Sequence, residues 1–134
     1  MRYTSGYKYQ LTNSIALRID GIALNTGVSN QFSTLFPNGD LVIFSGYAWD
    51  GCTGILDTKK NMEAGLVHDA LYQLCRGGQL SFSAYKIADQ AFADICIKNG
   101  TPRWLARLYH WGLKKMGGKY AMKSNRRRVH EVYR

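Results

Sequence analysis

The spacing of apolar residues changes near Asp57, and this change constrains the fold of the chain more than any other feature. Before Asp57, short segments rich in β-branched and aromatic residues alternate with turn sequences such as DG, NTG and PNGD. After Asp57, apolar residues recur with the spacing of an amphipathic helix. The sequence therefore predicts an α+β fold, with a β-rich first half and a helical second half.

Four segments of the first half have the composition of β-strands. They read YKYQL, SIALRI, QFSTLF and DLVIFSGY. Between the last two, Asn38-Gly39 suits a tight hairpin connection. We therefore expect a small antiparallel sheet ahead of the helices.

Three helices are expected in the second half. The first is capped by Asp57 or Thr58 and runs to about Cys75, where Gly77-Gly78 ends it. Because only a short link follows, the next helix is expected to fold back antiparallel to the first.

The second helix is capped by Ser81 or Ser83 and ends at Asn99-Gly100. Thr101-Pro102 opens the third helix, which ends at Gly117-Gly118. The expected architecture is a small antiparallel sheet, an antiparallel helix pair and one more helix.

The length of 134 residues suits a single domain. We expect this domain to span residues 1–118, with a β-rich part at 1–46 and a loop plus three helices at 47–118. Residues 119–134 are expected to form a basic C-terminal tail.

Composition excludes several classes of protein. No apolar run approaches the ~20 residues that span a bilayer, and the N-terminus lacks the apolar core of a Sec signal peptide. The cysteines (Cys52, Cys75 and Cys96) are odd in number and lack CxxC spacing, which argues against a disulfide framework or a structural zinc site. A reduced compartment, or assembly inside a particle, fits this cysteine usage.

Positive charge is concentrated in the last third of the chain. Residues 98–134 hold 11 Lys and Arg but one acidic residue, whereas residues 1–97 hold 7 Lys and Arg and 8 acidic residues. This asymmetry predicts an anionic partner, which is a lipid surface, a nucleic acid or an acidic protein. A solvated tail that aids solubility is the alternative.

A carboxylate in the second helix requires a buried partner. Asp89 lies on one stripe with apolar neighbours, namely Tyr85, Phe92, Ala93 and Cys96. A buried carboxylate is costly unless it is paired or hydrogen-bonded.

His68 in the first helix is expected to be that partner. It lies nine residues before Gly77, and Asp89 lies eight residues after Ser81, so antiparallel packing brings both to about the same level. Tyr72, one turn on from His68, offers its hydroxyl to the same carboxylate. An aspartate bonded to one ring nitrogen leaves the other nitrogen as a general base. A purely structural buried pair is the alternative.

Asp69, next to His68, is a candidate calcium ligand. The preceding loop, GYAWDGCTGILD, is punctuated by glycines, and its backbone carbonyls together with one helix carboxylate are the hard oxygen ligands that Ca²⁺ prefers. A turn whose glycines merely permit tight geometry is the alternative.

The glycine-rich loop, the His68-Asp69-x-x-Tyr72 run and Asp89 in ADQAFADIC together resemble phospholipase A2 over roughly residues 47–100. The resemblance is strongest to the phospholipase domain of parvovirus capsid proteins, which also lacks the dense disulfides of the secreted enzymes. The chain is also similar to an uncharacterised family of bacterial and phage proteins that carry YAWDG and HDALY.

This resemblance implies a role for each matching residue. His68 would activate a water, Asp89 would orient His68, and Tyr72 would support the pair. Asp69 would bind calcium together with loop carbonyls, expected at Trp49, Gly51 and Thr53. The calcium would polarise the ester carbonyl and stabilise the oxyanion. The loop itself departs from the family pattern, since Asp50 within it is unexpected.

Other hydrolytic sites fit the sequence less well. A metal phosphohydrolase with an adjacent His-Asp pair needs a further upstream histidine, and none precedes His68. His110 and His130 lack zinc-ligand spacing. A cysteine nucleophile, Cys52 or Cys75 with His68, remains an open alternative.

The third helix combines apolar and basic residues. Its apolar residues suit either an anionic membrane interface or simply the core. The basic residues expected to bind a membrane or a partner are Arg103, Arg107, Lys114 and Lys115 in this helix, and Arg126, Arg127 and Arg128 in the tail. The NRRR run also suits nucleic-acid phosphates, although no recognised nucleic-acid motif accompanies it.

Two functional hypotheses follow from the sequence. The first is a calcium-dependent phospholipase A2-like hydrolase, borne by a phage, that acts on bacterial phospholipid. The second is a non-catalytic phage virion or tail protein whose basic tail binds virion partners. The expected location is the phage virion or the host cytoplasm.

Overall fold

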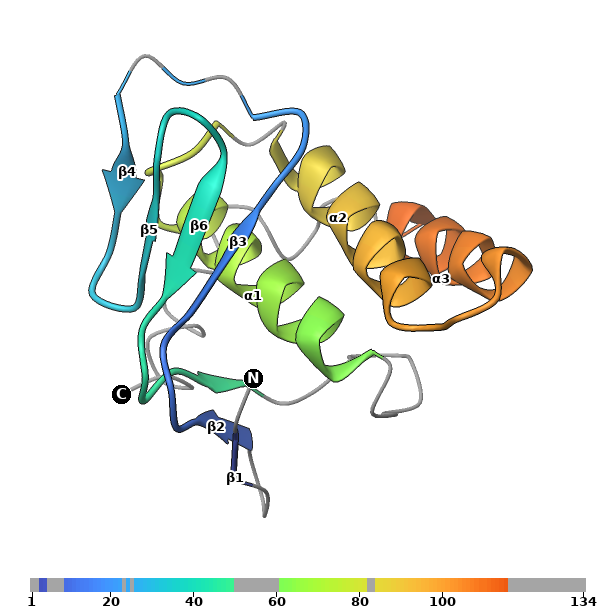
Figure 1. Cartoon of the computed structure of the whole chain (residues 1–134). Coiled ribbons are helices and arrows are strands. Elements are labelled where there is room, and N and C mark those ends of the chain that lie inside the picture. Colours follow the sequence, from blue (N-terminus) through green and yellow to red (C-terminus); the bar gives the residue numbers. More distant parts are fainter. Residues whose placement is uncertain are drawn as a thin grey trace.

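The computed structural model describes residues 3–4, 9–22, 24, 26–49, 61–81 and 84–115. It has an α+β arrangement in which antiparallel strands precede three helices (Figure 1). The expected fold class and the antiparallel helix pair are therefore confirmed. Within the described ranges, no helix is both long enough and apolar enough to span a membrane.

The larger sheet has four antiparallel strands in the order β3-β6-β5-β4. Their bounds are Ile15–Arg18 for β3, Val28–Ser29 for β4, Ser33–Leu35 for β5 and Asp40–Ile43 for β6. Along β6 the burial alternates, with Leu41 and Ile43 buried toward the helices. This alternation fixes the register, because a one-residue slip would turn both side chains to solvent.

The hairpin between β5 and β6 forms where Asn38-Gly39 predicted it. The Gly39 N–H donates to the Phe36 carbonyl at 3.0 Å, and the Phe36 N–H donates to the Asp40 carbonyl at 2.8 Å. Gly39 has φ +97°, a backbone conformation that favours glycine. The Asn38 side-chain oxygen also accepts from the Asp40 N–H, which stabilises the turn.

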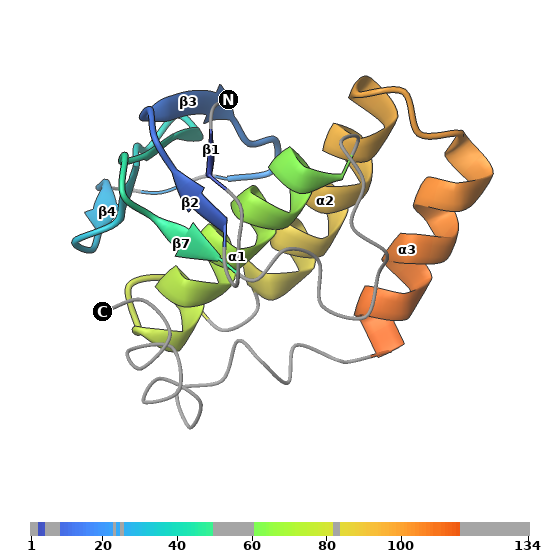
Figure 2. The same cartoon turned by 90° about the horizontal axis from the view of Figure 1, so that it is seen from below.

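A smaller, three-stranded sheet has the order β1-β2-β7, which the sequence did not separate from the larger one. Its strands are Tyr3–Thr4 for β1, Tyr9–Leu11 for β2 and Ala48–Trp49 for β7. Strand β2 is followed along the chain by β3 of the larger sheet, and β6 of the larger sheet precedes β7. The two sheets are therefore connected twice along the chain. Figure 2 shows β2 and β7 of this second sheet side by side.

Helix α1 spans Met62–Arg76, α2 spans Tyr85–Lys98 and α3 spans Arg103–Lys115. Helix α1 starts later than predicted, with Asn61 as its N-cap residue, and the expected caps Asp57 and Thr58 lie outside the described residues. The end of α1 agrees with the prediction, because Gly78 at φ +81° donates its N–H to the Cys75 carbonyl.

The start of α2 also differs from the sequence prediction. Its N-cap residue is Ala84, which makes no side-chain cap, and Ser81 contributes its backbone carbonyl to the Ala84 N–H. Ser83 lies outside the described residues. Helix α3 begins directly after Pro102, as predicted, and the Pro102 carbonyl accepts from the Ala106 N–H. The predicted end of α3 at Gly117-Gly118 and the tail 119–134 also lie outside the described part.

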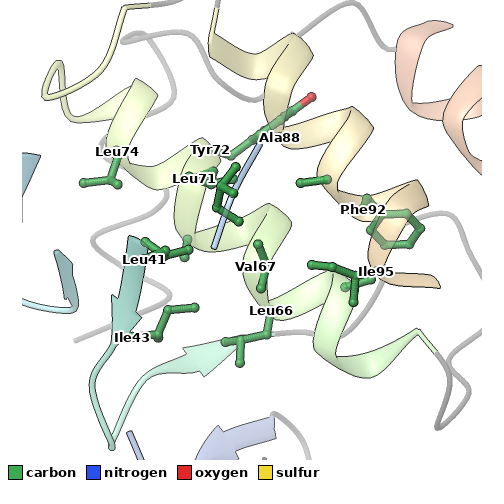
Figure 3. Packing of buried hydrophobic residues seen from close by; sticks show 14 of the residues in the cluster. Leu41, Ile43, Leu66, Val67, Leu71, Tyr72, Leu74, Ala88, Phe92 and Ile95 are labelled. Atoms are coloured by element: carbon green, nitrogen blue, oxygen red, sulfur yellow. The ribbon is translucent and has the colours of Figure 1, made fainter. Parts of the chain in front are cut away.

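Helix α1 is the central element, because the four-stranded sheet covers one of its sides and α2 covers the other. Leu41 and Ile43 of β6 point toward Leu66 and Leu71 of α1 (Figure 3). A helix that is buried nearly all round must lie in the interior, and 13 of its 15 residues are buried. Helix α3 lies on the far side of α2 from the larger sheet (Figures 1 and 2).

We predict that Gly39→Ala destabilises the protein more than Gly46→Ala. Both glycines have a positive φ, +97° and +93°, so both alanines would incur a strain of about 1–2 kcal/mol. A Cβ at Gly39 would also lie 2.6 Å from the Ile19 carbonyl oxygen, whereas a Cβ at Gly46 would meet no atom within 4 Å. Denaturant unfolding of both variants measures the difference. Equal losses in the free energy of unfolding would contradict this account of the turn.

Candidate functional site

The predicted partners His68, Tyr72 and Asp89 lie together between α1 and α2. The Nε2 atom of His68 is 2.8 Å from Oδ1 of Asp89. The Tyr72 hydroxyl donates to the same Oδ1 atom at 2.7 Å. Figure 3 shows Tyr72 reaching from α1 toward α2. Both distances are in the range of charge-assisted hydrogen bonds, so one carboxylate oxygen joins the two helices.

The hydrogen bond to Asp89 determines which ring nitrogen of His68 carries the proton in the neutral form. A carboxylate only accepts hydrogen bonds, so Nε2 must donate. In a neutral imidazole the other nitrogen, Nδ1, is then an acceptor. The dyad therefore presents Nδ1 as a base, which is the state that proton abstraction from water requires.

Two aromatic rings fix the orientation of the His68 ring. The Tyr72 ring lies 4.1 Å from it between centroids, tilted by 34°. The Phe92 ring makes an edge contact with it, at 5.8 Å and 81°. With its Nε2 bonded and two aromatic rings in contact with it, the imidazole has little freedom to rotate, and a held ring is what positioned acid–base chemistry needs.

Burial distinguishes the two members of the dyad. The Asp89 side chain is 3% exposed, and the His68 side chain is 11% exposed. Both groups are thus buried, and the imidazole keeps the larger remaining exposure. This arrangement suits a base that must meet a water or a substrate while its orienting carboxylate does not.

The hydroxyl of Tyr72 is held in its protonated form. Burial is the largest cause that raises the pKa of Tyr72, and the hydrogen bond to Asp89 raises it further. Tyr72 therefore acts as a hydrogen-bond donor to Asp89 and not as an acid or a nucleophile.

Cys75 and Cys96 are both buried free thiols. Burial raises the pKa of each thiol to about 11. A thiol with so high a pKa stays protonated near neutral pH, and the thiolate is the nucleophile. This argues against Cys75 as a nucleophile activated by His68. Cys52, the other thiol considered, lies outside the described residues.

Asp69, the predicted calcium carboxylate, is partly buried on α1 directly after His68. Within the described ranges, no group of three or more His, Cys, Asp and Glu residues gathers in a way that suits a metal ion. The predicted site does not need such a group, since most of its ligands are backbone carbonyls. Of those, Gly51 and Thr53 lie outside the described residues, and the backbone of Trp49 ends strand β7 opposite Tyr9. The role of these residues stays a prediction.

The basic residues predicted for α3 are all on the molecular surface. Arg103, Arg107, Lys114 and Lys115 are exposed. Arg126, Arg127 and Arg128 lie outside the described residues. The sequence had left open whether the apolar residues of α3 are core, and the structure separates them: Leu108 and Trp111 are exposed, and Leu113 is buried.

Sequence reasoning assigned no role to Phe92, which packs on the ring of His68. The sequence did contain a signal for this contact, because Phe92 follows Asp89 by three residues and therefore lies on the same helical face. The convergence of both hydrogen bonds on Oδ1 had no sequence signal, since it depends on side-chain rotamers.

In comparisons with known proteins, no family model, no curated protein and no solved structure matches the chain.

We predict that Tyr72→Phe lowers the free energy of unfolding at pH 8 by about 2 kcal/mol, because a hydrogen bond to a buried carboxylate is lost. The difference from wild type should shrink above pH 10. There the unfolded wild-type chain gains stability by ionising Tyr72, whereas burial keeps the folded Tyr72 protonated. Urea unfolding of both proteins from pH 8 to pH 11 measures this difference. A constant difference would contradict the raised pKa.

Proposed function

We propose that this chain is a calcium-dependent, phospholipase A2-like hydrolase that acts on an ester bond of bacterial phospholipid. The observation that supports the proposal best is the buried His68–Asp89 hydrogen bond, with Tyr72 donating to the same oxygen. A buried carboxylate that orients an imidazole is the arrangement of a general-base dyad.

The proposed reaction uses His68 twice. Nδ1 of His68 takes a proton from a water as the water oxygen bonds to the carbonyl carbon of the ester. The imidazolium, stabilised by the Asp89 carboxylate, then gives the proton to the departing glycerol oxygen as the acyl–oxygen bond breaks. The products are a fatty acid and a lysophospholipid, and the dyad returns to its starting state.

Asp69 and the carbonyls of Trp49, Gly51 and Thr53 would hold the calcium ion. When bound, the ion would polarise the ester carbonyl and stabilise its developing negative charge. Asp69 fits this part because it adjoins His68 in the sequence and keeps some exposure to solvent.

The proposed setting is a phage particle, or the cytoplasm of its host. This part rests on the similarity of YAWDG and HDALY to phage and bacterial proteins. Because calcium is scarce in cytosol, the enzyme would act when a particle enters or leaves a cell.

We predict that His68→Asn abolishes calcium-dependent release of the sn-2 fatty acid from labelled phosphatidylglycerol vesicles. Loss of a general base lowers the rate by about 10²–10⁴-fold. His110→Asn, a change at a histidine outside the dyad, is the matched control and should keep wild-type activity. Circular dichroism and thermal unfolding verify that each variant is folded.

If folded wild-type protein releases no fatty acid with calcium in excess, the hydrolase proposal is wrong. The alternative, a virion or tail protein that retains the fold and binds partners through its basic tail, would then account for the sequence. If His68→Asn hydrolyses as fast as wild type, the activity does not come from the dyad.

We predict that Asp69→Asn raises the calcium concentration for half-maximal activity by about tenfold or more, because one carboxylate ligand is lost. Asp94→Asn, which changes an exposed aspartate on α2, is the control and should leave this concentration unchanged. Initial rates over a calcium titration measure both. An unchanged calcium requirement in Asp69→Asn would remove Asp69 from the proposed site.

A further inference from the structure

Helix α3 has one face that the rest of the described structure leaves uncovered. Its buried face consists of Ala106 and Leu113, with Tyr109 packed edge-on against Phe92 of α2 at 6.1 Å. On the opposite face, Trp104, Leu108 and Trp111 are 68%, 52% and 56% exposed. Such a concentration of large apolar side chains on a surface marks an interaction site.

These three residues form a single stripe, because they stand at i, i+4 and i+7 on the helix. At about 100° per residue, Arg103, Arg107 and Lys114 follow one edge of this stripe. Lys115 continues the stripe, and its ammonium lies 4.6 Å from the ring centroid of Trp111. The helix contains no acidic residue. We refer to Trp104, Leu108, Trp111 and these four basic residues as the outer face of α3.

We propose that the outer face of α3 docks the protein on an anionic lipid surface. Tryptophan rings favour the boundary between water and acyl chains, and a leucine between them adds apolar area that enters the same boundary. The adjoining Arg and Lys side chains then reach the anionic headgroups, each of which adds to binding. The helix lies in the plane of the surface and does not cross it.

Charge decides between this occupant and two others. A second copy of the chain would bring two rows of positive charge together, since every ionised residue of the outer face is basic. A nucleic acid would pair with the basic row but would leave the tryptophans and the leucine in water, because phosphates offer no apolar partner. Of these three occupants, an anionic lipid surface satisfies both halves of the outer face.

The side of α3 opposite the docking face contacts a neighbour of the dyad. Tyr109 on the inner side of α3 contacts Phe92, and Phe92 contacts His68. Phe92 therefore lies between α3 and the base, and the docking face is on the far side of α3 from His68. The purpose of docking rests on the proposed function, but the docking itself is independent of catalysis and is measured without it.

The test uses full-length protein carrying His68→Asn, so that no lipid is hydrolysed. Sedimentation with phosphatidylglycerol vesicles and with phosphatidylcholine vesicles gives the bound fraction. The apolar variant adds Trp104→Ala, Leu108→Ala and Trp111→Ala, and the charge variant adds Arg107→Gln and Lys114→Gln. Residues 116–134 are the same in every protein, so the basic tail contributes equally to all of them.

The matched control removes exposed aromatic side chains elsewhere, with Phe36→Ala and Phe44→Ala on the β-rich part, which are 46% and 37% exposed. We expect the parent protein to bind phosphatidylglycerol vesicles about tenfold or more tightly than phosphatidylcholine vesicles. The apolar variant should lose about tenfold or more of this binding, and the control should keep it. The charge variant should bind more weakly and respond less to added salt.

Binding to phosphatidylglycerol that the apolar variant retains in full would overturn the proposal. So would a dimer of the parent protein, seen by analytical ultracentrifugation without vesicles, that the apolar substitutions dissociate. Binding to a DNA duplex that the charge variant loses would also overturn the proposal, if neither variant changes binding to vesicles. Failure of the hydrolase proposal is a separate result. In that case wild-type protein docks on vesicles through α3 but releases no fatty acid.

Discussion

The carboxylate of Asp89 must be neutralised or hydrogen-bonded where it lies, and the pairing of α1 with α2 depends on how this is achieved. Removal of an isolated carboxylate from water costs far more than a domain of this size can offset, so its partners have to be in place in the folded state. His68 and Tyr72 supply two donors to one oxygen, and both project from the same face of α1. A shift of α2 by one turn would break both bonds at once. The interaction therefore fixes the relative position of the two helices as well as the orientation of the imidazole.

The sequence was sufficient to predict this dyad because helical geometry is regular. His68 and Tyr72 share a face through their four-residue spacing, and a short link after α1 forces α2 to return antiparallel. Counting residues from the link then places Asp89 opposite His68. The hairpin at Asn38-Gly39 was predictable for a similar reason, since few residue pairs tolerate the backbone conformation that the turn demands.

Other features depend on tertiary contacts that a local pattern does not contain. The apolar residues of α3 occur on more than one side, and α2 determines which side is covered: Phe92 receives Tyr109, and this leaves Trp111 in solvent. The division of the strands into two sheets depends on how β2 pairs with β7 across almost forty residues of chain. Helix α1 begins at Met62 after Asn61, whose side chain makes no cap hydrogen bond, so its start does not follow from a capping preference in the sequence.

The same aromatic side chains that complete the core also connect the dyad to the outer surface of the protein. Phe92 is buried between α1 and α3, and its ring meets His68 on one side and Tyr109 on the other. A substitution at Phe92 would therefore loosen the packing of α3 and the orientation of the imidazole together. The elements therefore have different roles. Helix α1 contributes the largest group of buried apolar residues, and α2 supplies the orienting carboxylate. Helix α3 leaves its apolar stripe exposed, because Ala106, Tyr109 and Leu113 are on its inner face. Stability, the proposed proton transfer and the proposed surface recognition thus use different faces of the same three helices.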